Sequence, residues 1–480
     1  MATQLLKKLD PEELKNIQGI IISGYGHLPN VEYQFLRISE AMPAKKWLAS
    51  ILSEITTAHW PDDGNGKKKK PGCALNIAFT YQGFKELGLV VVDEFSQEFT
   101  EGIMEPHRIR RLGDDGNSAP ELWDIKENEI HLLLILQAPN IQERDDFSNK
   151  LSLEYANYGI NLVRREYGNQ PANNKEHFGF TDSISQPFIE NSPATPKGTQ
   201  SCISVGEFIL GYHNQYQLLP STPTVNNTDD KNNCLTSLST DNNLKDFGYN
   251  GSYLVFRKMY QDVAGFNRYL DLNTKNEEHK ALVAAKFVGR WPSGTPLVNA
   301  PDADVPDHEM KDKNDFFFMN TDAKGLSCPI ASHIRRTNPR DSLANDQQQS
   351  IETVNRHRLL RRGIQYGPPF AGGSVDDNQD RGILFLCVNA DIKRQFEFVQ
   401  QTWINNPKFG DMYNDRDPLA GNNFDPNADT SGKEYNMTIP ACVRERFTGI
   451  PRFVQVKGGG YFFLPGIPSL YFLAGVEKVI

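Results

Sequence analysis

Two segments in the second half of the chain share one design, an apolar run of β-forming residues followed by apolar residues at helical spacing. The runs are 252–256 and 382–388. The residues after each run lie at i, i+4, i+7 and i+11, which predicts one buried face of a helix. They are Met259, Val263, Phe266 and Leu270 after the first run, and Ile392, Phe396, Val399 and Trp403 after the second. The match predicts duplicated strand-helix units and restricts the fold more than any other feature.

The first half of the chain contains a similar pair. Its apolar runs are 74–79 and 131–136, and a further short strand is expected at 159–163. The helical positions that follow are Phe84 and Leu87 after the first run, and Ile141 and Phe147 after the second. Strands that each precede a helix predict an α+β fold, with helices on one face of an antiparallel sheet. Two ferredoxin-like halves would account for the length of 480 residues.

Three polar stretches without periodicity interrupt these units, at 213–248, 299–314 and 405–438. Loops of this length are usually surface insertions or functional segments. The first stretch lies near the middle of the chain and is taken as the domain boundary. We therefore expect an N-terminal domain over 1–245 and a C-terminal domain over 246–480.

Composition and charge exclude several classes of protein. Lys and Arg number 51 against 60 Asp and Glu, so the acidic balance argues against a nucleic-acid binder. No apolar run is long enough to span a membrane, and the N-terminus lacks the apolar core of a signal peptide, so a cytoplasmic location is expected. The six cysteines are widely spaced, which excludes a CxxC metal site and argues against a disulfide scaffold.

His333 stands out among the ten histidines because three arginines follow it within seven positions, in CPIASHIRRTNPRD at 328–341. A neutral imidazole can ligate a metal, and guanidinium groups pair with carboxylates such as haem propionates. The segment therefore fits an axial haem ligand. A basic surface turn with an incidental histidine fits the same residues, and the segment alone leaves both interpretations open.

Asp182 lies in GFTDSISQP at 179–187, between a flexible glycine and a turn-forming tail. A buried, positioned carboxylate beside a peroxide could move a proton from one oxygen to the other. The alternative role for an Asp in such a turn is a helix N-cap or an Asx-turn.

Arg361 belongs to a pair of arginines that precedes a Gly/Pro turn, in LRRGIQYGP at 360–368. An arginine that faces a peroxide would stabilise the charge that develops as the O–O bond breaks. An ion pair on a loop is the alternative, and no spacing rule connects this segment with the two described above.

Eight motifs of the chain resemble, in order, those of dye-decolourising peroxidases, and with NIQGII at 16–21 they cover nearly the whole sequence. They are GFTDSISQP (179–187), GEFILGY (206–212), NGSYLVFRK (250–258), VGRWPSGTPL (288–297), CPIASHIRRTNPRD (328–341), RRGIQYG (361–367), ILFLCVNADIKRQFEFVQQTW (383–403) and GGGYFFLPGIP (458–468). The resemblance implies two ferredoxin-like domains and one haem b, held between the sheet and helices of the C-terminal domain. The length and polar insertions are similar to those of the larger members of the family.

The resemblance also implies roles for individual residues. The axial haem ligand falls on His333, the distal aspartate of the family's GxxDG motif on Asp182, and the distal arginine on Arg361. The last glycine of GxxDG is Ser183 here, a departure from the pattern. If that position requires φ > 0, serine would strain the loop or redirect the aspartate. Its hydroxyl group could instead form a hydrogen bond near the pocket.

A haem b peroxidase that reduces hydrogen peroxide and oxidises dyes, phenols or other aromatic donors is the function implied. We expect a carboxylate, taken as Asp391, to accept the other ring N–H of His333. Arg335 or Arg340 would pair with the propionates, and Phe180 and Phe208 would form apolar walls. The 458–465 segment is expected to add to these walls. Trp123, Trp291 and Trp403 are candidates for surface oxidation by electron hopping, and core packing is the alternative for each.

The competing function is a haem carrier, store or sensor with little turnover, for which Ser183 is the sequence support. A ferredoxin-like structural module without haem is a third interpretation. The family's habit of assembling as dimers implies a homodimer, and no nucleic-acid or membrane partner is expected.

Overall fold

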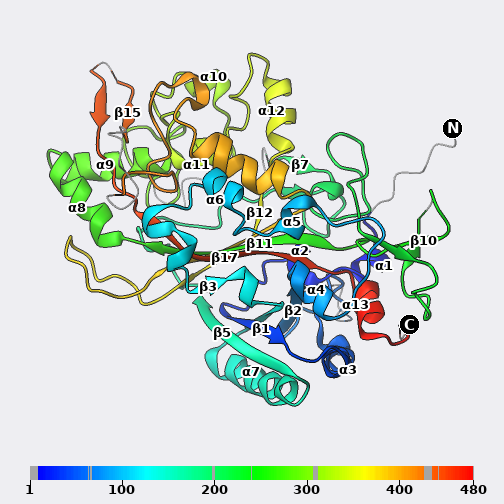
Figure 1. Ribbon diagram of the computed structural model, residues 1–480. Helices are drawn as coiled ribbons and strands as arrows, with labels where there is room; N and C mark the ends of the chain where they lie inside the picture. Colours follow the sequence, from blue (N-terminus) through cyan, green and yellow to red (C-terminus); the bar gives the residue numbers. More distant parts are fainter. Residues whose placement is uncertain are drawn as a thin grey trace.

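A single ten-stranded sheet runs through the molecule (Figure 1). The computed structural model describes residues 9–478 except 63, 65–66, 197–199, 239, 306–311, 426–434 and 442. The main path of the sheet has the order β12-β14-β11-β17-β2-β4-β1-β5, with β13 beside β14 and the short strand β3 (Ile125–Lys126) beside β17. No helix within the described residues is long and apolar enough to cross a membrane.

The first half of the chain supplies one ferredoxin-like unit. Its strands lie in the order β2-β4-β1-β5 and pair antiparallel, which is the arrangement of a β-α-β-β-α-β motif. The elements are β1 (Asn30–Ile38), α3 (Ala41–Ile51), β2 (Ala74–Phe79), β4 (Leu132–Ala138), α7 (Ile141–Ala156) and β5 (Ile160–Asn169). Every strand expected in this half from the apolar runs is present.

The second half repeats this arrangement. Its strands have the order β12-β14-β11-β17, again antiparallel. The elements are β11 (Ser252–Gln261), α8 (Val263–Asn273), β12 (Leu360–Arg361), β13 (Ile364–Tyr366), β14 (Gly382–Asn389) and β17 (Val454–Leu464). The helix after β14 is wound as π-helical turns at Lys393–Glu397 and Val399–Ile404. Met259 lies in β11, so the expected start of the first helical stripe was wrong: the strand continues to Gln261, and Asp262 caps α8 by accepting the N–H of Gly265.

The two units join edge to edge and close on themselves. Strand β17 pairs with β2 through Phe463 and Phe79. At the opposite edges β5 lies against β13, where Gly168 leaves room for Ile364: a Cβ at Gly168 would lie 2.2 Å from its Cγ2. The side chains enclosed by the curved sheet form one core, which includes Tyr33, Phe35, Phe208, Phe256 and Phe462.

Helices cover the outer face of the sheet in two groups. In Figure 1, α8, α9 (Glu277–Val288), α11 (His333–Thr337) and α12 (Gln347–Asn355) lie above β11 and β17, whereas α3 and α7 lie below. The other helices are α1 (Pro11–Leu14), α2 (Gly19–Ile22), α4 (Tyr81–Glu86), α5 (Gln97–Glu101), α6 (Pro106–Leu112), α10 (Met319–Asp322) and α13 (Ile467–Ala474). The upper helices are held off the second half of the sheet, and the space between them is the candidate site.

Candidate active site

A cavity of about 630 Å³ lies between the outer face of the second sheet half and the helices that cover it. Strands β11 and β14 contribute Met259, Ile383 and Phe385 to its floor. The helical side contributes His333, Ile334, Val399, Ile404 and Leu419. The walls are therefore mostly apolar, and polar groups converge at a few points, as in sites that hold a flat organic cofactor.

His333 begins α11 and faces the cavity, where its side chain is 33% exposed. Its Nδ1 lies 2.8 Å from Oδ2 of Asp417, a fully buried carboxylate. The other oxygen, Oδ1, accepts the backbone N–H groups of Leu419 and Ala420 at 2.9 Å. Asp417 thus fixes the orientation of the ring and leaves Nε2 as the nitrogen available to a ligand.

Each member of this pair affects the charge of the other. Burial by itself lowers the pKa of His333, but the charge and hydrogen bond of Asp417 outweigh it and raise that pKa above its ordinary value. Burial likewise opposes ionisation of Asp417, and His333 outweighs it, so the pKa of Asp417 is lowered. In the protein without a cofactor, each group therefore stabilises the charged form of the other.

The prediction that Asp391 is the partner of His333 was wrong. Asp391 accepts the N–H of Arg394 at 2.8 Å and pairs with its guanidinium group, so it caps the helix after β14. Asp417 lies 84 residues beyond His333, in the third polar stretch. No local pattern distinguishes it from the other carboxylates there.

Asp182 and Arg361 line the same cavity and contact each other. Nη1 of Arg361 lies 3.4 Å from Oδ1 of Asp182, and Nη2 donates to the carbonyl oxygen of Ser185 at 3.2 Å. Both side chains are about one third exposed, at 37% and 35%. The structure therefore brings together two polar residues that the sequence could not connect by spacing.

Ser183 has φ of +62° in the loop that carries Asp182. The position that is glycine in the family motif therefore does adopt the left-handed conformation, which disfavours serine. The N–H of Ser183 donates to Oδ1 of Asp182 at 2.6 Å. The loop consequently presents the aspartate to Arg361 in spite of the substitution.

One end of the cavity carries an excess of positive charge. Arg340 donates to the carbonyl oxygens of Asn314 and Phe316 at 3.0 and 2.8 Å, and burial followed by the charges of Arg290 and Arg358 lowers its pKa to about 9. Burial, followed by the charge of Arg361, lowers the pKa of Arg358 to about 10. Within the described residues, the Arg358 side chain has no hydrogen-bond partner. Sequence analysis did not identify Arg358.

Two of the predicted cofactor contacts lie away from the cavity. The buried guanidinium of Arg335 donates to the carbonyl oxygens of Asp322 and Cys328 at 2.9 and 2.8 Å and stacks on Phe318, so it holds a loop. Phe208 lies in the core enclosed by the sheet, because its segment packs on the inner face. Phe180, in contrast, lines the cavity as expected.

The structure does not support the remaining expectations, which concern the 458–465 segment and the three tryptophans. The 458–465 segment is largely strand β17, and the cavity wall from this strand is formed earlier, by Val454 and Val456. Trp123, Trp291 and Trp403 are all buried, with exposed fractions of 4%, 5% and 3%, so none offers a surface for a bulky donor.

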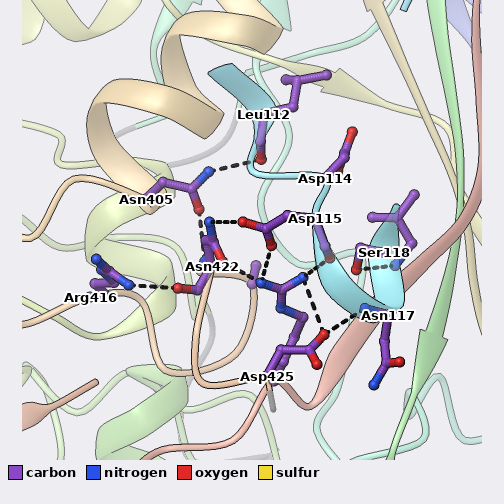
Figure 2. Close-up of polar contacts among 12 residues, drawn as sticks. Leu112, Asp114, Asp115, Asn117, Ser118, Asn405, Arg416, Asn422 and Asp425 are labelled. Atoms are coloured by element: carbon purple, nitrogen blue, oxygen red, sulfur yellow. Dashed lines mark hydrogen bonds and ion pairs between the residues drawn. The ribbon is translucent and has the colours of Figure 1, made fainter. Parts of the chain in front are cut away.

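A polar network ties the Asp417 segment to the first half of the chain (Figure 2). Nδ2 of Asn405 donates to the carbonyl oxygen of Leu112 at 2.9 Å, and Oδ1 of Asn405 accepts the N–H of Asn422. Arg452 donates to Asp115 through both of its terminal nitrogens, and Asn117 donates its N–H to Asp425 at 2.6 Å. These contacts fix the loop that positions Asp417.

The residues present fit a haem group. Three features agree with its chemistry: one oriented imidazole, apolar walls of suitable extent, and uncompensated arginines at one end that could pair with two propionates. No group of three or more His, Cys, Asp or Glu within the described chain could hold a bare metal ion. His333 would therefore be the one protein ligand to the iron.

Comparisons with known proteins agree with this geometry. A family model described as DyP dimeric alpha+beta barrel domain matches residues 16–169, and one described as Dyp-type peroxidase, C-terminal, matches residues 222–416. The dye-decolorizing peroxidase msp1 of Mycetinis scorodonius is 28% identical over 95% of this chain and 86% of its own length. A dye-decolorizing peroxidase of Auricularia auricula-judae is 27% identical with the same coverage.

Solved structures show the same likeness. A fungal DyP-type peroxidase from Auricularia auricula-judae superposes with a TM-score of 0.78 at 26% identity, over 96% of this chain and 99% of that one. A dye-decolorizing peroxidase in complex with 2,6-dimethoxyphenol gives the same TM-score, identity and coverage.

Proposed function

Since the chain belongs to the dye-decolourising peroxidase family, we propose that it holds one haem b on His333, with Asp182 and Arg361 as its catalytic pair. Its activity is that of the family, a hydrogen peroxide-dependent oxidation of organic donors. The observation that supports the assignment is that His333, bound by Asp417, lines the same cavity as the contacting pair Asp182 and Arg361. His333 comes from helix α11, whereas Arg361 comes from strand β12.

His333 would hold the iron through Nε2. Because Asp417 accepts from Nδ1, the ring is kept in the tautomer that leaves Nε2 unprotonated, and the carboxylate increases its basicity. Arg340 and Arg358, at the positive end of the cavity, would pair with the propionates. Phe180 and Phe385 would pack against the macrocycle. When bound, the haem supplies the iron that accepts electrons from the donor and passes them to peroxide.

Asp182 would act on the peroxide as a base and then as an acid. It would take the proton from one oxygen and return it to the other, which leaves as water. Arg361 would stabilise the negative charge that develops on the leaving oxygen. The contact between the two side chains, at 3.4 Å, supports a shared role, because both groups can then reach a molecule the size of peroxide.

Aromatic donors such as phenols and dyes are the proposed reductants, and a homodimer is the proposed assembly, the latter supported by the description of the matched N-terminal domain as dimeric. The alternative of a haem carrier with little turnover receives no support from the two fungal relatives described above, both of which are named as peroxidases.

Absorption spectra of the purified chain reconstituted with haem test the proposal. His333→Ala should lose the ligated Soret spectrum. Asp182→Asn and Arg361→Leu should keep it but react with hydrogen peroxide at least about 100-fold more slowly. Asp391→Asn is the matched control and should behave as the unchanged protein. A rapid peroxide reaction in Asp182→Asn would overturn the assignment.

A further inference from the structure

Glu176 occupies the centre of the loop that leads to Asp182. Its Oε1 accepts the backbone N–H of Phe180 at 2.9 Å, and its Oε2 accepts that of Phe178 at 3.0 Å. Nε2 of Gln261, at the end of β11, donates to the same Oε2 at 2.8 Å. A single carboxylate thus binds two amides of its own loop and one side chain of the sheet.

The backbone around Glu176 forms a closed turn. Its N–H donates to the carbonyl oxygen of Phe180 at 2.9 Å, and its carbonyl oxygen accepts from Gly179 at 2.8 Å. The turn ends where the N–H of Asp182 donates to the carbonyl oxygen of Asn174 at 2.9 Å. Asp182 is therefore attached directly to the structure that Glu176 organises.

The residue that follows Asp182 has an unfavourable backbone conformation. Ser183 has φ of +62°, in a region where a residue with a side chain is disfavoured. A loop free to relax would move Ser183 toward a more common conformation and would turn Asp182 away from Arg361. Other contacts of the loop must oppose this relaxation, and the nearest hydrogen bond of Glu176, at Phe180, lies three residues before Ser183.

We propose that Glu176 is a positioning residue, which clamps the 174–182 turn to β11 and holds Asp182 against Arg361 despite the strain at Ser183. This inference rests on the proposed role of Asp182 and extends it to a second carboxylate that lines the same cavity. Burial raises the pKa of Glu176, and the N–H groups of Phe178 and Phe180 oppose that rise. Hydrogen bonds from N–H groups favour the ionised form of a carboxyl group.

Glu176→Gln tests the clamp with little change of size. The amide has one acceptor oxygen where the carboxylate has two, so its NH2 group must face one of the three donors. At least one N–H of the turn then loses its partner in a buried place. Gln261→Leu removes the tether to β11 while it leaves the carboxylate in place.

Amide hydrogen exchange measures the protection of these backbone N–H groups independently of catalytic activity. In the full chain, prepared with and without haem, Glu176→Gln should lower the protection of the Phe178 or the Phe180 amide, whichever faces the new NH2 group, by about tenfold or more, equivalent to about 1.4 kcal/mol. Glu190→Gln, an exposed position on the far side of Asp182, is the matched control and should leave both amides unchanged. Unchanged protection in Glu176→Gln would overturn the clamp.

The catalytic consequence is measured by separating the two half-reactions. Glu176→Gln and Gln261→Leu should slow the reaction with peroxide about tenfold or more and leave the later reaction with a phenolic donor unchanged. A general loss of stability would not separate these steps. Because glycine adopts the conformation of Ser183 without strain, adding Ser183→Gly to Glu176→Gln should restore most of the peroxide rate.

The outcomes distinguish the clamp from the proposed function. If Asp182→Asn reacts normally with peroxide while exchange at Phe178 or Phe180 responds to Glu176→Gln, the clamp exists and the proposed role of Asp182 is wrong. If Asp182→Asn is slow but Ser183→Gly has the same effect with and without Glu176, the clamp does not oppose the strain and the inference fails.

Discussion

Asp417→Asn should weaken the binding of haem by His333 without removing the ring. Oδ1 of Asp417 accepts the N–H groups of Leu419 and Ala420. In the asparagine variant the side-chain oxygen would keep these two bonds, and the NH2 group would therefore face His333. A donor facing Nδ1 forces that nitrogen to be an acceptor. The ring proton then moves to Nε2, the atom that faces the cavity, and blocks it as a ligand.

The expected magnitudes follow from this geometry. Loss of an oriented partner behind a ligating histidine typically costs about 10- to 100-fold in affinity for the metal group, and the tautomer shift places this case at the upper end. The haem-free protein loses one hydrogen bond between charged groups, about 1.5 kcal/mol near neutral pH. This is the lower end of the range, because the His333 side chain is 33% exposed to the cavity, where solvent screens the charges.

The pH dependence of that stability has a definite sign. The pKa of His333 is raised above 6.5, so its contribution is complete below that pH and is lost as pH rises through the raised value. The pKa of Asp417 is lowered below 3.8, so its contribution is complete above that pH and is lost as pH falls through the lowered value. The stabilisation from the pair in the haem-free protein is therefore greatest between these limits.

Haem titration followed by the Soret band measures the affinity, and urea unfolding of the haem-free protein between pH 4 and about 8 measures the stability. Asp391→Asn is the control in both assays, because Asp391 is a similar carboxylate that caps a helix elsewhere. Wild-type haem affinity in Asp417→Asn, or a stability loss that does not depend on pH, would refute the argument.

Four further substitutions test other parts of the structure. Ser183→Gly should raise the free energy of unfolding by about 0.5 to 1 kcal/mol, since it relieves φ of +62°, and a lower Tm would contradict this. Arg358→Leu should weaken haem binding about tenfold with little loss of stability, because Arg358 lines the cavity. Arg335→Leu should instead lower the free energy of unfolding by about 3 kcal/mol in urea, because Arg335 is buried away from the cavity. Gly289→Ala should cost about 2 kcal/mol or more, since it would place a Cβ at φ of +96°, 2.4 Å from Ile334 Cγ1; an unchanged Tm would disprove the close contact.

Local patterns predicted the parts of the fold that depend on neighbouring residues. The apolar runs gave the strands of both units, because alternation and helical spacing reflect burial in the segment itself. The same patterns could not assign a face of the sheet: Phe208 is as apolar as Phe180, but it lies in the inner core. The prediction that Arg335 contacts the cofactor was wrong for a geometric reason. Residues two apart on a helix point to different sides, and His333 faces the cavity.

The polar partners in the site were beyond such patterns. His333, Asp182 and Arg361 were found through motifs, but Asp417, Arg358 and Glu176 acquire their roles only through the fold. Asp417 is 84 residues from the ring that it orients, and it lies in a stretch that reads as a polar insertion. The local sequence around such a carboxylate does not predict which histidine it contacts in the folded protein.

The closure of the sheet explains how Asp182 and Arg361 meet across 179 residues. Strand β5 ends at Asn169 and lies against β13, so the loop that follows β5 begins at the seam between the two units. Nε2 of Gln365, in β13, donates to the carbonyl oxygen of Lys175 at 2.8 Å and fastens this loop beside β12, which carries Arg361. Each unit thus contributes one member of the pair, and neither half alone would contain it. The duplication visible in the sequence is therefore also the origin of the site.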